Sequence, residues 1–234
     1  MDTIAQAFGA AAVLIGRGDP ALAHIVALSL RVSLSAVALA ALLGLPLGAW
    51  IAVHRFPGRQ PLIVVLNALM GLPPVVVGLL VYLLLSRAGP LGAFGVLFTP
   101  TAMVIAQTIL ILPIIAALAR QVIEDAWRDY DEQLRSLGVR PFGASLTLLW
   151  DCRFSLATAI LAGFGRAAAE VGAVMIVGGN IDGVTRVMTT AIALETSKGD
   201  LPLALALGLV LVALVLAVNA GAHLIRETAQ RRYG

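Results

Sequence analysis

Long, uninterrupted apolar runs alternate along the chain with short polar segments. Five runs are long enough to cross a membrane, and they cover about residues 25–53, 62–85, 93–119, 154–177 and 201–225. A hydrocarbon core of about 30 Å needs roughly 20 apolar residues in a helix, because backbone polar groups must be satisfied within the segment. No run alternates with a period of two, as barrel strands do. The pattern predicts an all-α membrane protein with about five transmembrane helices.

Composition agrees with this class. The chain is 60% hydrophobic and 12% charged, whereas soluble domains are roughly 45–50% apolar and 25% charged. Residues 1–20 are too polar and too rich in glycine to span with certainty. We expect residues 3–15 to form an interfacial helix, with a marginal extra span as the alternative. The single cysteine, Cys152, forms no intrachain disulfide and is expected to be a small buried residue.

Basic residues lie unevenly at the ends of the apolar runs. They follow the first run, separate the third from the fourth, and follow the fifth: His54, Arg55, Arg59, Arg120, Arg128, Arg135, Arg140, Arg226, Arg231 and Arg232. The positive-inside rule places these regions in the cytoplasm and the N-terminus outside. We therefore expect an inner-membrane protein with a membrane domain over residues 21–226 and a cytoplasmic tail over 227–234. No basic stripe with interleaved aromatics indicates nucleic acid.

Residues 120–154 form a cytoplasmic insert that is longer than two neighbouring helices need. Apolar positions recur there with helical spacing in two stretches, namely Trp127, Tyr130, Leu134 and Leu137, and then Phe142, Leu146 and Leu149. Between the stretches, Gly138 suits a left-handed helix C-terminus and Pro141 suits the first turn of a helix. The insert is predicted to be helix, glycine turn, helix. Periodicity alone fits a solvated hairpin and a docking element equally well.

The insert also carries a resemblance. Glu132, followed six positions later by Gly138, is similar to the Glu-Ala-Ala loop of binding-protein-dependent ABC transporter permeases, although Gln133 and Leu134 replace the two alanines. The runs GLPPVVVGLLVYLLLSRAGPLG (71–92) and GFGRAAAEVGAVMIVGGNIDGVTRVMTTAIALETSKGDL (163–201) resemble molybdate and tungstate permeases. TTAIALETSKGD is closer to the tungstate branch. The resemblance covers about residues 22–219.

The resemblance implies a type I ABC importer permease whose insert docks on a separate ATPase through Glu132, Leu134, Arg135 and Gly138. The chain lacks the G-x-x-x-x-G-K-[ST] phosphate loop, so ATP and Mg are expected on that partner and no cofactor on this chain. Further expected partners are a periplasmic or lipid-anchored oxyanion-binding protein and a second copy of the chain. A pair is expected because five helices are few to enclose a path for a hydrated anion.

Charged and helix-breaking residues inside the apolar runs are candidates for the translocation path. Arg166 is expected roughly 16 Å deep, and Glu170, four residues on, would share its helical face and pair with it. This pair either holds helices together or gives the path positive potential. Prolines in the second run predict a kink. The candidates for the path or gate are Gly71, Pro73, Pro74, Gly78, Arg166, Glu170 and Gly172.

Polar residues crowd the segment that follows the fourth run. They are either solvated loop residues or the outer mouth of the path, and the candidates for contact with substrate are Asn180, Thr185, Thr189 and Thr190. Hydroxyl and amide donors suit an oxyanion that must be held and then released. The expected cargo is tungstate or molybdate.

Two other functions are weighed against an importer subunit. An intramembrane enzyme would need a catalytic cluster, whereas His24, His54 and His223 are scattered near the ends of runs. A secondary transporter would be favoured by two related halves with matching broken helices, and no such repeat is visible. Neither alternative accounts for the insert, so the chain is expected not to be an enzyme.

Overall fold

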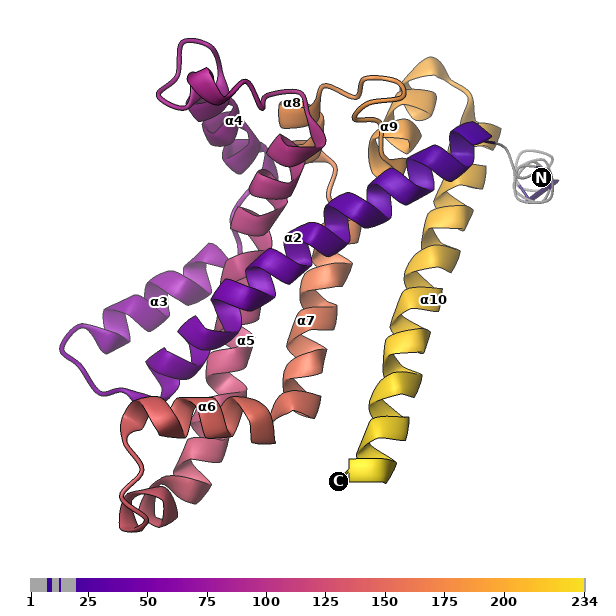
Figure 1. Ribbon diagram of the computed structural model, residues 1–234. Helices are drawn as coiled ribbons and strands as arrows, with labels where there is room; N and C mark the ends of the chain where they lie inside the picture. The colour runs from indigo at the N-terminus through magenta and orange to yellow at the C-terminus, as the bar shows by residue number, and fades with distance from the viewer. Residues whose placement is uncertain (1–7, 10–12, 14–19, 234) are drawn as a thin grey trace. The chain divides into compact units, whose positions relative to one another are not determined.

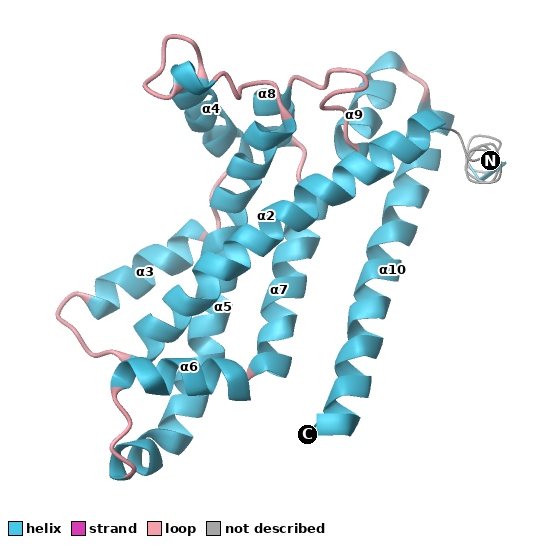
Figure 2. Cartoon of the chain, viewed as in Figure 1, coloured by secondary structure: helices cyan, strands magenta, loops and turns pink. Residues whose placement is uncertain are grey.

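The fold was obtained as a computed structural model that describes residues 8–9, 13 and 20–233. Within these residues all regular structure is helical (Figures 1 and 2). Three helices are long and apolar enough to cross a membrane, namely α2 (Pro20–Val53), α5 (Pro100–Ser136) and the part of α10 (Leu201–Tyr233) up to Ala222. The number rises to as many as five if each of two broken helix pairs counts as one span. The predicted all-α membrane class is confirmed.

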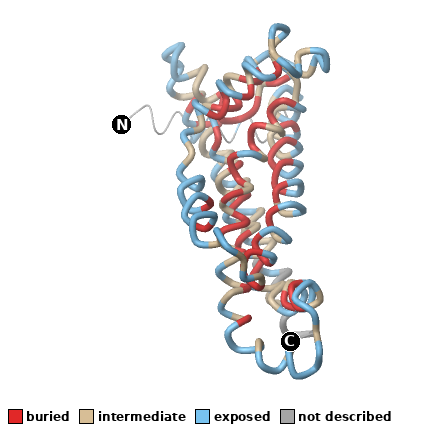
Figure 3. Tube along the Cα trace, turned by 90° about the vertical axis from the view of Figure 1, so that its left-hand side faces the viewer, coloured by how far each residue is buried: buried red, intermediate tan, exposed pale blue. Residues whose placement is uncertain are grey.

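The chain folds into two compact units. The first unit comprises Met1–Ser35, Pro73–Gln107 and Ala168–Ile225, and the second comprises Ala36–Leu72, Thr108–Ala167 and Arg226–Gly234. Each unit has buried residues of its own, and Figure 3 shows buried and exposed residues alternating along the helices. For membrane helices, exposed leucine and valine are expected, because lipid is as apolar as they are.

The second unit is built on the C-terminal half of α2 and the middle of α5. Gly48 allows close packing there, since a Cβ at this position would lie 2.5 Å from the Ala116 backbone oxygen. The short helix α3 (Arg59–Leu69) packs Ile63 and Leu66 against the same two helices. Helices α6 (Pro141–Asp151) and α7 (Arg153–Ala168) complete the unit, with a bend of 77° between them.

The first unit contains the pair α4 (Pro74–Leu85) and α8 (Gly172–Gly178), the short 3-10 turn η1 (Gly92–Phe94), α9 (Met188–Lys198) and most of α10. A hydrogen bond fastens α9 to the N-terminal half of α2: the Met188 N–H donates to the Ser29 Oγ at 2.8 Å. Helix α9 was not expected from the sequence, which predicted an irregular loop there.

Two predicted spans are each broken into two helices, which corrects the sequence interpretation. The run 62–85 is divided into α3 and α4, with residues 70–73 outside both helices. The chain is therefore interrupted where the prolines predicted a kink, and Pro73 caps α4 while Pro74 occupies its first turn, a position that proline favours. The run 154–177 is divided into α7 and α8, with residues 169–171 outside both helices.

The other boundaries differ less. Helix α2 begins five residues before the predicted 25–53 run, and α5 begins at Pro100, later than the predicted residue 93. Helix α5 continues without interruption to Ser136, so the first helix of the insert is the end of a membrane helix. The predicted interfacial helix at residues 3–15 lies, apart from three positions, outside the described residues.

Candidate functional site: the coupling insert and the α4–α8 region

The glycine turn of the insert has the predicted geometry. Gly138 has a φ of +70°, in the left-handed region. The Gly138 N–H donates to the Arg135 carbonyl at 2.9 Å, and the Val139 N–H donates to the Leu134 carbonyl at 3.0 Å. These two bonds form a Schellman motif, which satisfies carbonyls at the end of α5. The motif reverses the chain in a fixed direction before Pro141 starts α6.

The insert is anchored in the core of the second unit. Trp127 on α5 and Ala144 and Leu148 on α6 belong to one buried cluster with the end of α2. Leu134 packs against the edge of this cluster. The prediction for α6 holds only in part: Leu149 packs against the cluster, whereas Phe142 and Leu146 are exposed. The fully buried positions are Ala144, Ser145 and Leu148. Helix α6 therefore packs directly against α5 through this cluster.

The opposite side of the insert is exposed and apolar. The exposed fractions are 77% for Leu137, 70% for Phe142 and 72% for Trp150. Glu132 is also exposed, on the last turns of α5, and Arg135 forms an ion pair with Asp131. The predicted topology places this side in water, where a group of large exposed apolar side chains is typical of an interaction site. This arrangement favours the docking element over the solvated hairpin.

A cluster of charges that the sequence analysis did not single out joins three elements beside the insert. Arg59, at the start of α3, donates from Nε to the Ile51 carbonyl of α2 at 2.8 Å and pairs through Nη2 with the Glu124 Oε1 of α5 at 3.1 Å. Glu124 also pairs with Arg120 and, at 3.8 Å, with Arg128. The only signal in the sequence was the spacing of four residues between these charges on α5.

In the first unit, α4 and α8 are in close contact. A Cβ at Gly78 would lie 2.7 Å from the Ala173 Cα, and a Cβ at Gly172 would lie 3.0 Å from the Val75 Cγ2. Small residues at such positions let two backbones approach in a membrane. The Pro73 carbonyl accepts hydrogen bonds from the N–H groups of Val76 and Val77 at 3.1 and 3.2 Å. The Pro73 carbonyl at the break is thus satisfied by N–H groups in the first turn of α4.

Glu170 has a different setting from the one predicted. Helix α7 ends at Ala168, so Glu170 lies outside the helix that carries Arg166, and the pairing of the two side chains stays a prediction. The Glu170 side chain is 3% exposed. Its Oε1 accepts the Ala173 N–H at 2.9 Å, in the first turn of α8, and its backbone carbonyl accepts the Thr189 hydroxyl at 2.8 Å. A carboxylate at a helix N-terminus is stabilised by the free N–H groups there.

The loop threonines are buried, so the interpretation of them as solvated is wrong. The Thr185 Oγ1 donates to the Gly178 carbonyl at 2.6 Å and accepts the Ile181 N–H at 2.9 Å. The Thr190 Oγ1 donates to the Val187 carbonyl at 3.0 Å. Asn180, in a left-handed conformation with φ +50°, donates to the Thr190 carbonyl at 3.4 Å. These groups hold the backbone between α8 and α9 in place.

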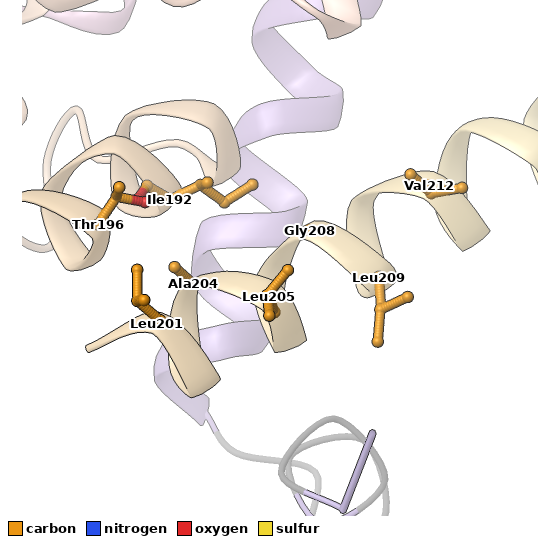
Figure 4. Close-up of a pocket in the computed structure, with 8 residues that line it drawn as sticks. All are labelled: Ile192, Thr196, Leu201, Ala204, Leu205, Gly208, Leu209 and Val212. Atoms are coloured by element: carbon orange, nitrogen blue, oxygen red, sulfur yellow. The ribbon is translucent and has the colours of Figure 1, made fainter. Parts of the chain in front are cut away.

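An apolar groove of about 520 Å³ lies between α9 and α10 (Figure 4). Ile192 and Thr196 of α9 face a row of small and aliphatic residues of α10, namely Leu201, Ala204, Leu205, Gly208, Leu209 and Val212. The Thr196 hydroxyl already donates to the Ile192 carbonyl at 2.8 Å. A charged oxyanion would lose its hydration here without gaining donors. The groove suits hydrocarbon.

Comparison of the sequence with known proteins shows the family of the chain. The sequence profile of the family described as the binding-protein-dependent transport system inner membrane component matches residues 44–233. The chain belongs to this family. It is 43% identical to a probable anion ABC transporter permease protein of Haloferax volcanii, over 91% of this chain and 94% of that protein. It is 40% identical to the tungstate uptake system permease protein of Peptoclostridium acidaminophilum, over 97% of this chain and all of that protein.

A more distant relative is the molybdenum transport system permease protein of Mycobacterium tuberculosis, which is 30% identical over 84% of this chain and 77% of that protein. The predicted resemblance is thus confirmed. The chain is a multi-pass inner-membrane transport subunit and not an enzyme. Membership in this family implies an ATPase and a binding protein as partners in general.

Proposed function

We propose that the chain is the membrane-spanning permease of an ABC importer that carries a tetrahedral oxyanion, tungstate or molybdate, into the cytoplasm. The observation that carries the proposal is the 40% identity to a tungstate permease over nearly the whole chain. Its relatives include anion and molybdenum permeases as well. The two anions have the same charge and shape, so we assign the choice between them to the binding protein.

The proposed energy source is a separate ATPase that binds ATP and Mg and grips the insert. The surface for this contact comprises Leu137, Phe142 and Trp150, with Glu132 at its edge. Its support is the combination of an exposed apolar side with a buried side that is packed into the second unit. A movement of the ATPase applied to such a rigid element is transmitted to α2, α5 and α7 as a rigid-body movement.

The proposed path runs along the two-fold axis of a pair of identical chains. The residues proposed for the path or gate are Gly71, Pro73, Pro74, Gly78, Arg166, Glu170 and Gly172, and those proposed for the outer mouth are Asn180, Thr185, Thr189 and Thr190. The buried hydrogen bonds of the three threonines assign them first to shaping the mouth. A contact with the substrate requires that a hydroxyl exchange its backbone partner for the anion during the cycle. The N-terminus is proposed to be outside and the C-terminus in the cytoplasm.

Uptake into proteoliposomes tests the proposal. The vesicles hold the full chain, its ATPase and the loaded binding protein, and the measurement is ATP-dependent entry of radiolabelled tungstate, with molybdate and sulfate as competitors. We expect competition by molybdate at concentrations where sulfate has little effect. Uptake that proceeds without the ATPase, or that carries no oxyanion, contradicts the proposal.

Two variants connect uptake to the insert. Glu132→Arg reverses a charge on the docking surface and is expected to abolish uptake, whereas Gln133→Arg, at the neighbouring exposed position, is the matched control for adding an arginine. Gly138→Pro is also expected to abolish uptake, because proline requires a φ near −65° and Gly138 has +70°. Normal uptake by Glu132→Arg, with the chain present in the membrane, overturns the assigned surface.

A further inference from the structure

A small cavity lies beside the insert, inside the second unit, and Arg135 alone among its lining residues is also expected to contact the ATPase. Its volume is about 270 Å³, below the roughly 300–1,000 Å³ of pockets for drug-sized ligands. The lining residues come from three segments: the end of α2 and the loop after it, α5, and the turn before α6 together with the first residue of that helix. They are Val53, His54, Arg55, Trp127, Arg135, Val139 and Pro141.

The lining is basic. Arg55, Arg135 and His54 face one cavity, and no carboxylate lines it. Asp131 pairs with the Nε of Arg135, and a guanidinium has five N–H donors, so this contact leaves others for a ligand. Within the part of the chain that the structure describes, no carboxylate pairs with Arg55. Asp131 offsets the charge of Arg135, so the uncompensated charge at the cavity is that of Arg55, which an anion would neutralise.

The start of α6 adds to this potential. Pro141, at the first position of this eleven-residue helix, lines the cavity, and no side chain caps the helix there. The N-terminus of a helix carries a partial positive charge that favours phosphate, although Pro141 itself has no N–H to donate. The helix terminus and the basic side chains come from different elements and favour the same kind of ligand.

The surroundings of the cavity are typical of a membrane interface. Trp50, His54 and Phe56 form a stack, with ring centroids 5.4 Å apart for Trp50 and His54 and 4.8 Å apart for Trp50 and Phe56. The His54 Nδ1 lies 3.1 Å from the Trp50 carbonyl oxygen, which fixes the imidazole at the rim. Tryptophan is enriched where spans leave the hydrocarbon. Basic pockets at the cytoplasmic ends of membrane helices bind lipid headgroups.

We propose that this cavity binds a phosphate group, supplied by the headgroup of an anionic phospholipid. The guanidinium groups of Arg55 and Arg135 donate to the phosphate oxygens, and the N-terminus of α6 adds its partial charge. A lipid held there ties the loop after α2 to the insert. The inference concerns a site apart from the proposed translocation path and does not depend on which oxyanion is carried.

The test uses the full-length chain in nanodiscs of phosphatidylcholine mixed with phosphatidylglycerol. After partial delipidation, mass spectrometry measures the ratio of the two lipids retained by the chain, relative to the bulk mixture. We expect the lipid retained by the wild type to be enriched in phosphatidylglycerol. In Arg55→Gln this enrichment should be about five times lower, which is the effect of one arginine near an anionic lipid. Arg55→Lys, which keeps the charge, should retain most of it.

The matched control is Arg140→Gln, which removes an exposed arginine of the same insert that does not line the cavity. Free phosphate is distinguished by calorimetric titration of inorganic phosphate into the lipid-depleted chain. If the wild type binds inorganic phosphate, Arg55→Gln does not, and phosphatidylglycerol is not enriched, the cavity is a phosphate site whose ligand is free phosphate. Equal enrichment in Arg55→Gln and Arg140→Gln, with no binding of inorganic phosphate, overturns the proposal.

Discussion

The charge cluster around Glu124 gives a prediction in which burial and the number of ion-pair partners decide the outcome. Glu124 and Asp125 are neighbours on α5, and each pairs with arginine. The Glu124 side chain is 21% exposed, and its partners Arg59 and Arg120 are 16% and 15% exposed. The Asp125 side chain is 64% exposed, and its partner Arg128 is 70% exposed. Glu124→Gln and Asp125→Asn therefore remove the same charge from two different environments.

The expected magnitudes follow from this difference. An exposed ion pair contributes about 0–1 kcal/mol, so Asp125→Asn should change the free energy of unfolding by less than about 0.5 kcal/mol. Removal of one partner of a fully buried pair costs about 3–5 kcal/mol, because the other charge is left unpaired. Glu124 is mostly buried, and removal of its charge leaves two poorly hydrated arginines without it. We therefore expect Glu124→Gln to lower the free energy of unfolding by about 2 kcal/mol. At roughly 2–4 °C per kcal/mol for a chain of this size, Tm falls by about 4–8 °C.

Thermal unfolding of the two variants in detergent, followed by near-UV circular dichroism, measures this difference. High salt should reduce the effect of Asp125→Asn further and leave most of the effect of Glu124→Gln, because salt screens exposed charges more than buried ones. A double-mutant cycle between Arg59 and Glu124 should give a coupling energy of about 1 kcal/mol or more. Equal Tm values for the two variants would refute the idea that Glu124 fastens α2 and α3 to α5.

Three further predictions test other parts of the structure. Gly48→Ala should lower the free energy of unfolding by about 1–2 kcal/mol, because the added Cβ would lie 2.5 Å from a backbone oxygen of α5. Gly165→Ala should be neutral or stabilising, because no atom lies within 4 Å of the added Cβ. Thermal unfolding of the two variants measures the difference. Gly138→Ala should lower the free energy of unfolding, measured by thermal unfolding, by about 1 kcal/mol, because the left-handed conformation is unfavourable for alanine. Burial, and to a lesser degree the charge of Asp151, raises the pKa of the Cys152 thiol above its ordinary value. Alkylation of Cys152 by iodoacetamide should therefore be slow at neutral pH, and its rate should still increase above pH 9. Fast alkylation at pH 7 would contradict this.

Features set by local chemistry were predictable from the sequence. Helix α2 follows from hydrophobicity over a run that is far longer than a buried helix needs. The reversal at Gly138 follows from the placement of a glycine after the last apolar position and a proline three residues later. The family was predicted from short motifs, and the comparisons confirm it.

Features set by contacts between distant residues were not predictable. Hydropathy treats residues 154–177 as one span, since it does not register that the buried Glu170 side chain accepts an N–H from the first turn of α8. Likewise, Thr185 and Thr190 have polar side chains, yet their hydroxyls are satisfied by nearby backbone and are buried. Arg59 is distant in sequence from Glu124, so a single sequence does not show that the two pair.

The central claim is that the insert lies in the cytoplasm and is covered there by an ATPase. Leu137, the most exposed of the apolar residues at its turn with 77% exposure, is the position to label, as Leu137→Cys in a Cys152→Ser background. The measurement is the rate of reaction with a membrane-impermeant maleimide in intact cells and in inverted vesicles, with and without the ATPase. The account predicts no labelling from outside, rapid labelling in inverted vesicles and slower labelling when the ATPase is present. Labelling in intact cells, or a rate that the ATPase leaves unchanged, would contradict it.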